Sequence, residues 1–409
     1  MPDDLRSLTP DELGRRVTAA GQPRFRAEQV FRWLHGHGAA SMDVMTNVPR
    51  ELRDTLARDL PMSPLALDAE QVAADGTRKM RFVTADGRGI ESVLIPEEHP
   101  RDDVRLTPMA AGADGEGGTG RRDKLTLCVS SQVGCALDCA FCATATLGFG
   151  RNLTAGEIVQ QIYEATARAG RRPSNLVFMG MGEPLHNLDN VVRAFSLLIH
   201  PWGAGFSPRR ITVSTAGLVP GIAALGRLTP APNLAISLNA TTDEVRDDLM
   251  PINRKWPIAE LMKAARAFPL GHGRKVTFEY VLLAGVNDSD ADAERLPRLI
   301  KGLPSMINII PWNPFAGPQF RRPSAERIRT FQEILRRHDV QTYIRTPRGD
   351  DIDAACGQLA VRGRPDLVPA PRKPRRSAPD LSLPGDAENP ASSTSPAPPP
   401  WPPSAPTTN

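Results

Sequence analysis

The segment CVSSQVGCALDCAFC, residues 128–142, contains four of the five cysteines of the chain. Within it, Cys135, Cys139 and Cys142 have the spacing C-x3-C-x2-C. Three thiolates can bind three irons of a four-iron cluster and leave the fourth iron open to a small molecule, whereas closed clusters use four cysteines. A structural zinc site that includes Cys128 is the alternative, but zinc sites usually pair C-x2-C units, and only the last two cysteines have that spacing. The spacing therefore favours an open iron–sulfur cluster.

Around this segment, β-branched runs alternate regularly with amphipathic helical sequence. A capping box, Thr154 to Glu157, begins the first helix. The expected strands are LTLCVS, NLVFMG, RITVST, NLAISL, VTFEYVLL and MINIIPW, and the expected helices between them include AGEIVQQIYEATARA, DNVVRAFSLLI, IAELMKAARAF and SAERIRTFQEILRRH. Six strands, each followed by helical sequence, predict an α/β fold, a partial (βα)6 barrel over residues 124–364. Its active site is expected at the carboxyl ends of the strands.

The first 65 residues predict a small helical accessory domain with one basic side. A capping box with proline at the first helical position, residues 9–12, begins one helix. Apolar residues at helical spacing predict two more: Ala27, Val30, Phe31 and Leu34, then Leu52, Leu56 and Leu60. Arg26, Arg32 and His35 fall off the apolar stripe of the second helix, so we expect them on its polar side.

The regions outside the barrel have different compositions. Two β-like runs, 79–84 and 90–95, predict a β-hairpin extension within residues 66–123, followed by a long mobile loop at 97–123. Fourteen of the 40 prolines lie in residues 365–409, which predicts a disordered tail. The basic stretch 372–376 in this tail could contact RNA phosphates, although a solvated tail is the simpler interpretation.

Length and charge set wider bounds. A chain of 409 residues can form one large core plus an accessory domain. The net charge of +4 allows a nucleic-acid partner without requiring one. There is no apolar run long enough to cross a membrane, and the polar start MPDDLRSLTPDEL does not look like a secretion signal. We therefore expect a cytoplasmic protein, where clustered cysteines more often bind metal than form disulfides.

The cysteine motif, with Phe141 before its last cysteine, resembles that of the radical S-adenosylmethionine superfamily. The wider stretch 128–162 is similar to one branch of it, the ribosomal-RNA adenine methyltransferases of the RlmN and Cfr family. The resemblance covers the barrel almost completely and extends into the helical region. It continues through FMGMGEPLHN, ITVSTAG, LAISLNA, MPINRKW, INIIPWNPF, RTPRGDDIDAACGQL and FRAEQVFRWLHGHG.

The resemblance implies a [4Fe-4S] cluster on the three motif cysteines and two molecules of S-adenosylmethionine per turnover. Gly180, Gly182 and Glu183 match the cofactor-binding motif of the family. Without the resemblance, this glycine-rich strand end would be an ordinary βα turn. The further cofactor contacts that the resemblance implies are Ser214, Ser237, Leu238, Asn239 and Asn313. Asn239 is a departure, because members of the family often have histidine there.

The resemblance also implies the role of three residues outside the cluster motif. Cys356 is expected to be the S-methylcysteine intermediate, and Cys128 the resolving thiol that forms a transient disulfide with Cys356. Glu91 is expected to be the proton acceptor. Read alone, Cys356 would be a small buried hydrophobe and Glu91 a surface carboxylate on a strand. The connection from Glu91 to Cys128 is longer than is typical of the family, which puts the placement of Glu91 in question.

The substrate implied by the resemblance is C2 of an adenine in 23S rRNA, at the peptidyl-transferase centre. Some members also modify an anticodon-adjacent adenine in tRNA, and an electron donor such as flavodoxin is expected. C2 is an unactivated carbon, so a radical route is needed, and the base must be unstacked to reach the site. Arg209 and Arg210 are candidate RNA contacts. The alternatives are C8 methylation of the same RNA, as in the Cfr branch, and a non-catalytic metal-stabilised RNA-binding protein.

Overall fold

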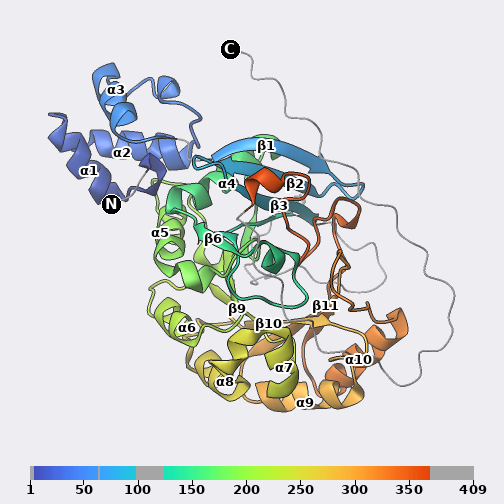
Figure 1. Ribbon diagram of the computed structural model, residues 1–409. Coiled ribbons are helices and arrows are strands. Elements are labelled where there is room, and N and C mark those ends of the chain that lie inside the picture. Colours follow the sequence, from blue (N-terminus) through green and yellow to red (C-terminus); the bar gives the residue numbers. More distant parts are fainter. Residues whose placement is uncertain (1–3, 63–64, 98–123, 369–409) are drawn as a thin grey trace, which may run out of the picture.

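The fold is built on one curved ten-stranded sheet (Figure 1). The computed structural model describes residues 4–62, 65–97 and 124–368. Strand order in the sheet is β1-β2-β3-β4-β7-β8-β9-β10-β11-β12. Seven strands run parallel: β4 (Lys124–Cys128), β7 (Asn175–Phe178), β8 (Ile211–Thr215), β9 (Asn233–Ser237), β10 (Val276–Leu282), β11 (Ser305–Pro311) and β12 (Thr342–Ile344). The six predicted barrel strands are confirmed, and β12 adds a seventh that was not predicted.

Helices cover the outer side of this parallel sheet (Figure 1). They are α4 (Ala155–Ala169), α5 (Leu188–Ile199), α6 (Val219–Gly226), α7 (Asp243–Leu249), α8 (Ile258–Ala267), α9 (Asp290–Ile300) and α10 (Ala325–Arg337). The four predicted helices correspond to α4, α5, α8 and α10. Within the described residues, no helix is both long and apolar enough to cross a membrane. The predicted α/β class with a partial radical-SAM-type barrel is therefore confirmed.

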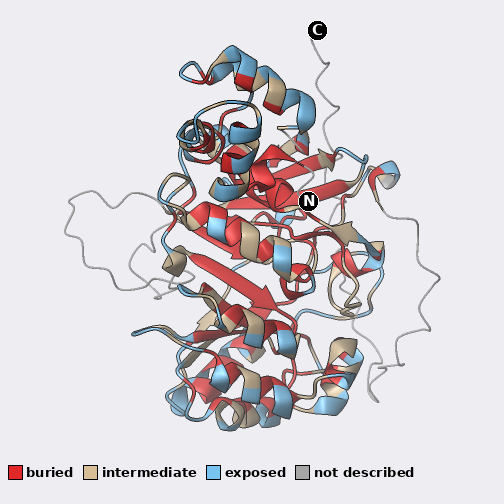
Figure 2. Cartoon of the chain, turned by 90° about the vertical axis from the view of Figure 1, so that its left-hand side faces the viewer, coloured by how far each residue is buried: buried red, intermediate tan, exposed pale blue. Residues whose placement is uncertain are grey.

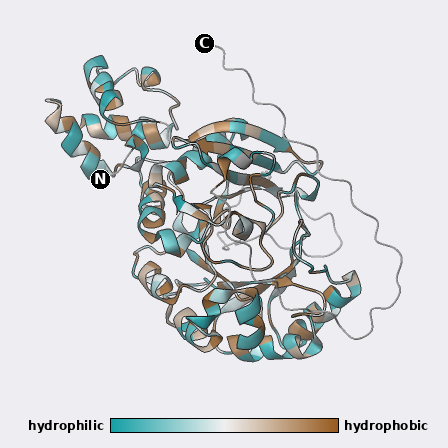
Figure 3. Cartoon of the chain, in the orientation of Figure 1, coloured by the Kyte–Doolittle hydropathy of each residue, from teal (hydrophilic) through white to brown (hydrophobic). Residues whose placement is uncertain are grey.

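Burial follows the alternation of helices and strands. Figure 2 shows the strands largely buried and the outer helix faces exposed, and Figure 3 shows hydrophobic residues concentrated along the strands. In β8 all five residues are buried, because this strand has a neighbour on each side and lies beneath the helices. Central parallel strands are buried on both faces, so their sequences are continuous apolar runs.

Three antiparallel strands extend the sheet beyond β4. They are β1 (Leu65–Val72), β2 (Arg78–Thr84) and β3 (Gly89–Glu97), and β3 pairs antiparallel with β4. The two predicted runs are confirmed as β2 and β3. The long loop predicted for 97–123 lies outside the described residues, apart from the last residue of β3.

The N-terminal region contains α1 (Pro10–Ala19), α2 (Arg26–Phe31) and α3 (Arg50–Asp59). The predicted capping box is present, with the Glu12 N–H donating to Thr9 Oγ1 at 3.3 Å. The prediction for His35 was wrong: its side chain is buried and its Nδ1 lies 2.7 Å from the Tyr163 hydroxyl of α4. The reason is a π-helical turn, Arg32–Gly36, whose wider turn brings both Leu34 and His35 to the buried side.

The C-terminal prediction needs a smaller correction. Residues 365–368, the start of the predicted disordered tail, form a short turn against the β2–β3 hairpin. Leu367 is only 4% exposed, and Arg88 Nη1 donates to the Val368 carbonyl at 3.0 Å. Burial of Leu367 orders this segment despite its proline. The rest of the predicted tail, including its basic stretch, lies outside the described residues.

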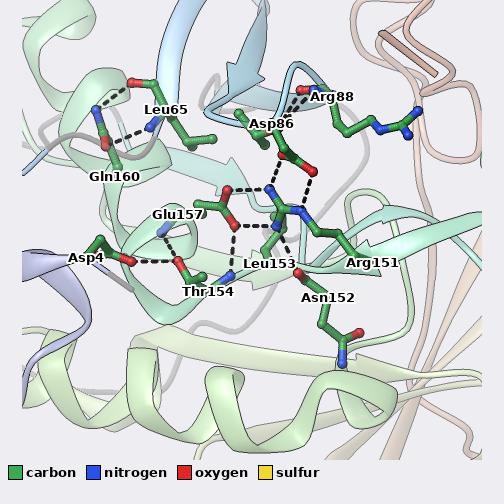
Figure 4. Close-up of polar contacts among 12 residues, drawn as sticks. Asp4, Leu65, Asp86, Arg88, Arg151, Asn152, Leu153, Thr154, Glu157 and Gln160 are labelled. Atoms are coloured by element: carbon green, nitrogen blue, oxygen red, sulfur yellow. Dashed lines mark hydrogen bonds and ion pairs between the residues drawn. The ribbon is translucent and has the colours of Figure 1, made fainter. Parts of the chain in front are cut away.

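A polar network joins the hairpin, the N-terminal region and α4 (Figure 4). Arg151 donates to Asp86 in the β2–β3 turn at 2.6 Å and 2.9 Å, and to Glu157 in the first turn of α4 at 2.8 Å through each of two nitrogens. Thr154 Oγ1, the N-cap of α4, donates to Asp4 at 2.9 Å. These contacts fix the hairpin and the N-terminal region against the barrel.

Candidate active site

One cavity lies at the carboxyl ends of the parallel strands, as the barrel fold predicts. It brings together residues from the segment after β4, from β8, β9 and β10, and from the segments that follow β7 and β11. Its lining includes Cys135, Cys139, Cys142, Gly180, Gly182, Glu183, Ser214, Ser237, Asn239, Asn313 and Cys356. The predicted cluster ligands, most of the predicted cofactor contacts and the predicted methyl carrier therefore share one cavity.

The cysteine loop is held from three directions. The Cys135 N–H donates to the Gly148 carbonyl at 2.8 Å, and the Ala140 N–H donates to the Leu249 carbonyl at 2.9 Å. Trp312 Nε1 donates to the Phe141 carbonyl at 3.1 Å. These bonds use backbone groups of the loop, so the thiols remain free to bind metal.

Burial keeps the thiols of this loop protonated in the absence of a metal. Burial raises the pKa of Cys135 to about 12 and that of Cys139 well above its ordinary value. Metal binding would displace these protons, because thiolates are the binding form. Across the described residues, no three His, Cys, Asp or Glu side chains converge closely enough to hold a single metal ion.

The distribution of the four cysteines between two cavities distinguishes the two metal interpretations, because Cys135, Cys139 and Cys142 line one cavity together. A zinc site needs its ligands around one ion, whereas a four-iron cluster takes each thiolate at a separate corner. Moreover, Cys128 lines a neighbouring cavity and not the one that contains the cluster cysteines. The donor set therefore fits an iron–sulfur cluster on three cysteines and does not fit a four-cysteine zinc site.

The two glycines after β7 are required by close packing. A Cβ on Gly180 would lie 2.8 Å from the Ser130 backbone nitrogen, and one on Gly182 would lie 2.4 Å from the Gln132 Cβ. Gly182 also has φ of 97°, in the region that favours glycine. Gln132 Oε1 accepts from the Glu183 N–H at 2.8 Å, so this side chain shapes the turn.

Glu183 is held in the cavity wall by two backbone donors. Its carboxylate accepts from the Ala216 N–H at 2.8 Å and from the Leu185 N–H at 3.0 Å. Burial raises the pKa of Glu183 to about 7. By contrast, Leu238 is fully buried in the hydrophobic core and is not among the residues that line this cavity. Its N–H donates to the Glu279 carbonyl at 3.0 Å, and its carbonyl accepts from Arg246 Nε at 2.9 Å.

The two asparagines predicted to contact the cofactor differ in how far their side chains are already hydrogen-bonded to the protein. Asn239 has φ of 56°, and its Oδ1 accepts from the Val281 N–H at 2.8 Å, so part of its side chain is already bonded to the protein. Asn313 Nδ2 donates to the Cys356 carbonyl at 3.2 Å. The buried Asn313 Oδ1 has no partner among the described residues and is available to a ligand.

Cys356 sits where two cavities meet. It lines the cluster cavity and also a second cavity, which is lined by Cys128, Arg345 and Arg348 among others. Its surface is exposed to these cavities. The surrounding atoms still exclude enough water to raise the pKa of its thiol to about 11, with Arg345 opposing this shift. All five cysteines are free thiols in this structure, and the predicted disulfide is not formed.

The second cavity contains the other predicted mechanistic thiol. The pKa of Cys128 is raised, mainly by burial and to a smaller extent by the nearby Cys356. Arg345 opposes this shift. Arg345 lines both cavities, and its side chain makes no hydrogen bond or ion pair with another described residue. The sequence analysis did not identify Arg345, although its position inside the RTPRGDD segment shortly before Cys356 was a usable signal.

Glu91 is buried, not on the surface. Its Oε2 accepts from the Ala360 N–H at 3.0 Å, four residues after Cys356, and its Oε1 has no partner among the described residues. Burial raises the pKa of Glu91, with Lys79 opposing the shift. Glu91 thus contacts the segment that carries Cys356, but it is not among the residues that line the two cavities.

The arginines proposed as RNA contacts lie elsewhere. Arg209 and Arg210 form a short turn directly before β8, at the amino end of this strand, whereas the cavity is at its carboxyl end. Arg210 Nη1 lies 3.4 Å from Asn175 Oδ1. The structure does not bring these two side chains to the cavity.

Comparisons with protein families agree with this geometry. Residues 129–296 match the radical SAM superfamily, and residues 3–60 match the ribosomal RNA large subunit methyltransferase N-terminal domain. A solved radical SAM methyltransferase from Sphaerobacter thermophilus is similar with a TM-score of 0.79 at 46% identity, covering 88% of this chain and 99% of that one.

Curated relatives are similar over nearly the whole chain. The dual-specificity RNA methyltransferase RlmN of Anaeromyxobacter sp. is 49% identical, over 92% of this chain and 94% of the relative. The protein of the same name from Geobacter sulfurreducens is 49% identical, over 89% of this chain and 93% of the relative.

Proposed function

The chain belongs to the RlmN family of radical SAM RNA methyltransferases, and from this we propose that it methylates C2 of an adenine in 23S rRNA. An anticodon-adjacent adenine in tRNA is a second proposed substrate, in keeping with the dual specificity in its relatives' names. The observation that carries the proposal is the meeting of two cavities at Cys356, one containing the cluster cysteines and the other containing Cys128.

The residues present fit the cofactors of this family. Cys135, Cys139 and Cys142 would hold the [4Fe-4S] cluster. S-adenosylmethionine would lie against Gly182, Glu183, Ser214, Ser237, Asn239 and Asn313, which line the cavity, whereas Leu238 does not line it. When bound and reduced by a donor of the flavodoxin class, this pair supplies the 5'-deoxyadenosyl radical that an unactivated ring carbon requires. Two molecules of S-adenosylmethionine are used per turnover in this proposal.

Two thiols, those of Cys356 and Cys128, carry out the remaining steps of the proposed reaction. Cys356 carries the methyl group, and this group loses one hydrogen atom before its carbon bonds to C2 of the base. The adduct then loses the ring proton to Glu91 and one electron, which the cluster would take up, so that Cys356 is covalently joined to the base. Cys128 then attacks the Cys356 sulfur: a sulfur–sulfur bond forms, the carbon–sulfur bond breaks with its electron pair on the carbon, and that carbon takes a proton to become the product methyl. The position of both thiols on one cavity supports this step, and the reduced state described above is the state before it.

Glu91 is the proposed acceptor of the ring proton. Its unpartnered Oε1 and its raised pKa suit a group that takes up a proton. Because Glu91 is buried and lines neither cavity, direct contact with a base requires a shift of the segment after Cys356, to which its other oxygen is bonded. Ribosomal and transfer RNA substrates, together with thiols that must be reduced, place the proposed reaction in the cytoplasm.

The test is nucleoside mass spectrometry of unmodified 23S rRNA fragments incubated anaerobically with reconstituted protein, S-adenosylmethionine and a reductant. We expect 2-methyladenosine, none with Cys356→Ala, and a covalent protein–RNA adduct with Cys128→Ala. Finding 8-methyladenosine would assign the Cfr-type activity instead. An intact cluster that cleaves no S-adenosylmethionine would favour the non-catalytic RNA-binding alternative.

A further inference from the structure

Glu279 is a buried carboxylate in the wall of the cluster cavity. It lies on β10, is 4% exposed, and interrupts an otherwise apolar strand, VTFEYVL. In the parallel ladder its neighbours are Ser237 on β9 and Asn308 on β11. Register partners in parallel strands point to the same face of a sheet, so Glu279 lies beside Ser237, one of the proposed cofactor contacts.

The two oxygens of this carboxylate have different surroundings. Asn308 Nδ2 donates to Oε1 at 2.9 Å, which orients the group. Oε2 is buried and has no hydrogen-bond partner among the described residues. Leaving a buried acceptor unsatisfied is costly, so native structures rarely do so without a ligand, ion or water.

The charged and titratable groups that act on Glu279 do not supply the missing donor. Burial raises the pKa of Glu279 and the Arg345 guanidinium opposes this shift, but no ion pair joins the two described side chains. Cys356 lines the same cavity, and Glu279 adds to the effect of burial in raising the pKa of its thiol. Oε2 is therefore free to accept a hydrogen bond from an N–H or O–H group of a bound molecule.

We propose that Glu279 Oε2 accepts a hydrogen bond from the exocyclic amino group of an adenine ring, with Asn308 as the residue that positions it. This inference rests on the proposed function, in which two adenosines enter the site: that of S-adenosylmethionine and that of the target RNA. An acceptor at this position favours the 6-amino group of adenine and disfavours the 6-oxo group of hypoxanthine. Sites built on a buried hydrogen bond discriminate strongly against analogues that cannot make it.

The experiment compares amino and oxo forms of each adenosine by binding, without methyl transfer. Reconstituted holoenzyme is titrated with S-adenosylhomocysteine and S-inosylhomocysteine, and separately with 23S rRNA hairpins that carry adenosine or inosine at the target position. We expect the wild-type protein to prefer the amino form of one pair by about tenfold or more. The pair that shows the preference identifies which adenosine Glu279 contacts.

The informative variant is Glu279→Gln. Its amide oxygen can keep the bond from Asn308, and its amide N–H replaces Oε2, so the preference is expected to fall or to reverse toward the oxo form. Glu333→Gln, which removes an exposed charge on α10, should leave the preference unchanged. Asn308→Ala should weaken the preference without reversing it. This variant provides the test if Glu279→Gln fails to fold or to bind iron.

Two results would overturn the inference. Equal binding of amino and oxo forms by the wild-type protein would make Glu279 a structural carboxylate or a ribose contact. An unchanged preference in a folded, iron-containing Glu279→Gln variant would assign the recognition to another residue. A clear preference in a protein that forms no methyladenosine would reject the proposed reaction and keep the adenine contact.

Discussion

The Ala143 N–H donates to the Gly357 carbonyl at 2.7 Å, which joins the residue after Cys142, the third proposed cluster ligand, to the residue after Cys356, the proposed methyl carrier. A second bond from Thr144 Oγ1 to the Leu359 carbonyl, also 2.7 Å, lies beside it. The position of Cys356 over the cluster cavity is therefore fixed by the cluster loop itself.

Removing one of these two bonds should slow methyl loading of Cys356. Thr144→Val keeps the side-chain shape and leaves a carbonyl without its donor, at a cost of about 1 kcal/mol. Small displacements at a reacting group are expensive, so we expect the loading rate to fall by about tenfold. Peptide mass spectrometry of Cys356 after incubation with S-adenosylmethionine measures this rate.

The nearby Thr146→Val is a matched control for the Thr144 variant. Its hydroxyl donates to the Ala143 carbonyl within the same loop and does not contact the segment of Cys356. Equal loading rates in the two variants would show that the bond to Leu359 does not position the thiol.

Gly182→Ala should destabilise the protein through a clash as well as through backbone strain. Its Cβ would lie 2.4 Å from the Gln132 side chain, which itself bonds the turn. Gly302 has φ of 78°, but a Cβ there would meet no other atom within 4 Å, so Gly302→Ala tests the strain alone. We expect losses of about 3 kcal/mol and about 1 kcal/mol respectively in urea unfolding. Equal losses would show that the packing against Gln132 is not tight.

Arg151→Met should destabilise the protein by about 2 kcal/mol. The substitution leaves Glu157, which is 3% exposed, without its ion pair, although the arginine is one-third exposed and its contribution is reduced accordingly. It also loosens the β2–β3 turn, because Asp86 loses its ion pair with Arg151 and keeps its bond from Thr84 Oγ1 within the turn. Hydrogen exchange in this turn should rise along with the drop in unfolding free energy.

The comparison for Arg151 is an exposed ion pair. Arg24 lies 2.7 Å from Asp11 with both side chains largely in solvent, so Arg24→Met should cost less than about 0.5 kcal/mol. A loss as large as that of Arg151→Met would contradict the assignment of the effect to burial.

His35 should make stability fall in mild acid. Burial lowers its pKa from the ordinary 6.5 to about 3, so the unfolded chain binds a proton that the folded chain excludes. The contribution of neutral His35 is therefore complete above pH 6.5 and is lost progressively as the pH falls toward 3. Between pH 7.5 and 5.5 we expect a loss of about 1.4 kcal/mol from this residue.

Urea unfolding at the two pH values tests the prediction for His35. His35→Gln should lower stability at pH 7.5 but reduce its pH dependence, whereas the exposed His272→Gln should change neither. A pH dependence identical to wild type in His35→Gln would assign the acid sensitivity to other groups.

The sequence predicted the barrel well because its central strands are buried on both faces. Such strands are apolar runs that need no tertiary information to be recognised. β12 was missed because it has only three residues, and β1 because LALDAEQV contains few strong strand formers. α9 was missed although Ser289 begins a capping box, since Pro297 lies inside the helix.

The candidate site was predicted less evenly. Cysteine spacing and the family resemblance located the residues that share the cluster cavity, since these lie in short motifs after strands. Glu279 and Arg345 were not identified, because their relevance depends on which oxygen lacks a donor and on which cavity a side chain reaches. The prediction for His35 failed because it assumed a regular helical period of 3.6 residues. The π-helical turn that buries this side chain cannot be read from that period.

The contact between Glu91 and Ala360 spans 269 positions along the chain. During synthesis the amino-terminal part of a chain emerges and folds first, so the barrel strands and the cysteine loop are made before the segment of Cys356 exists. A nascent chain that has not reached residue 356 contains the cluster ligands but has no methyl carrier. If Cys356 is the methyl carrier, as proposed, only a chain translated beyond the whole barrel can begin the proposed reaction.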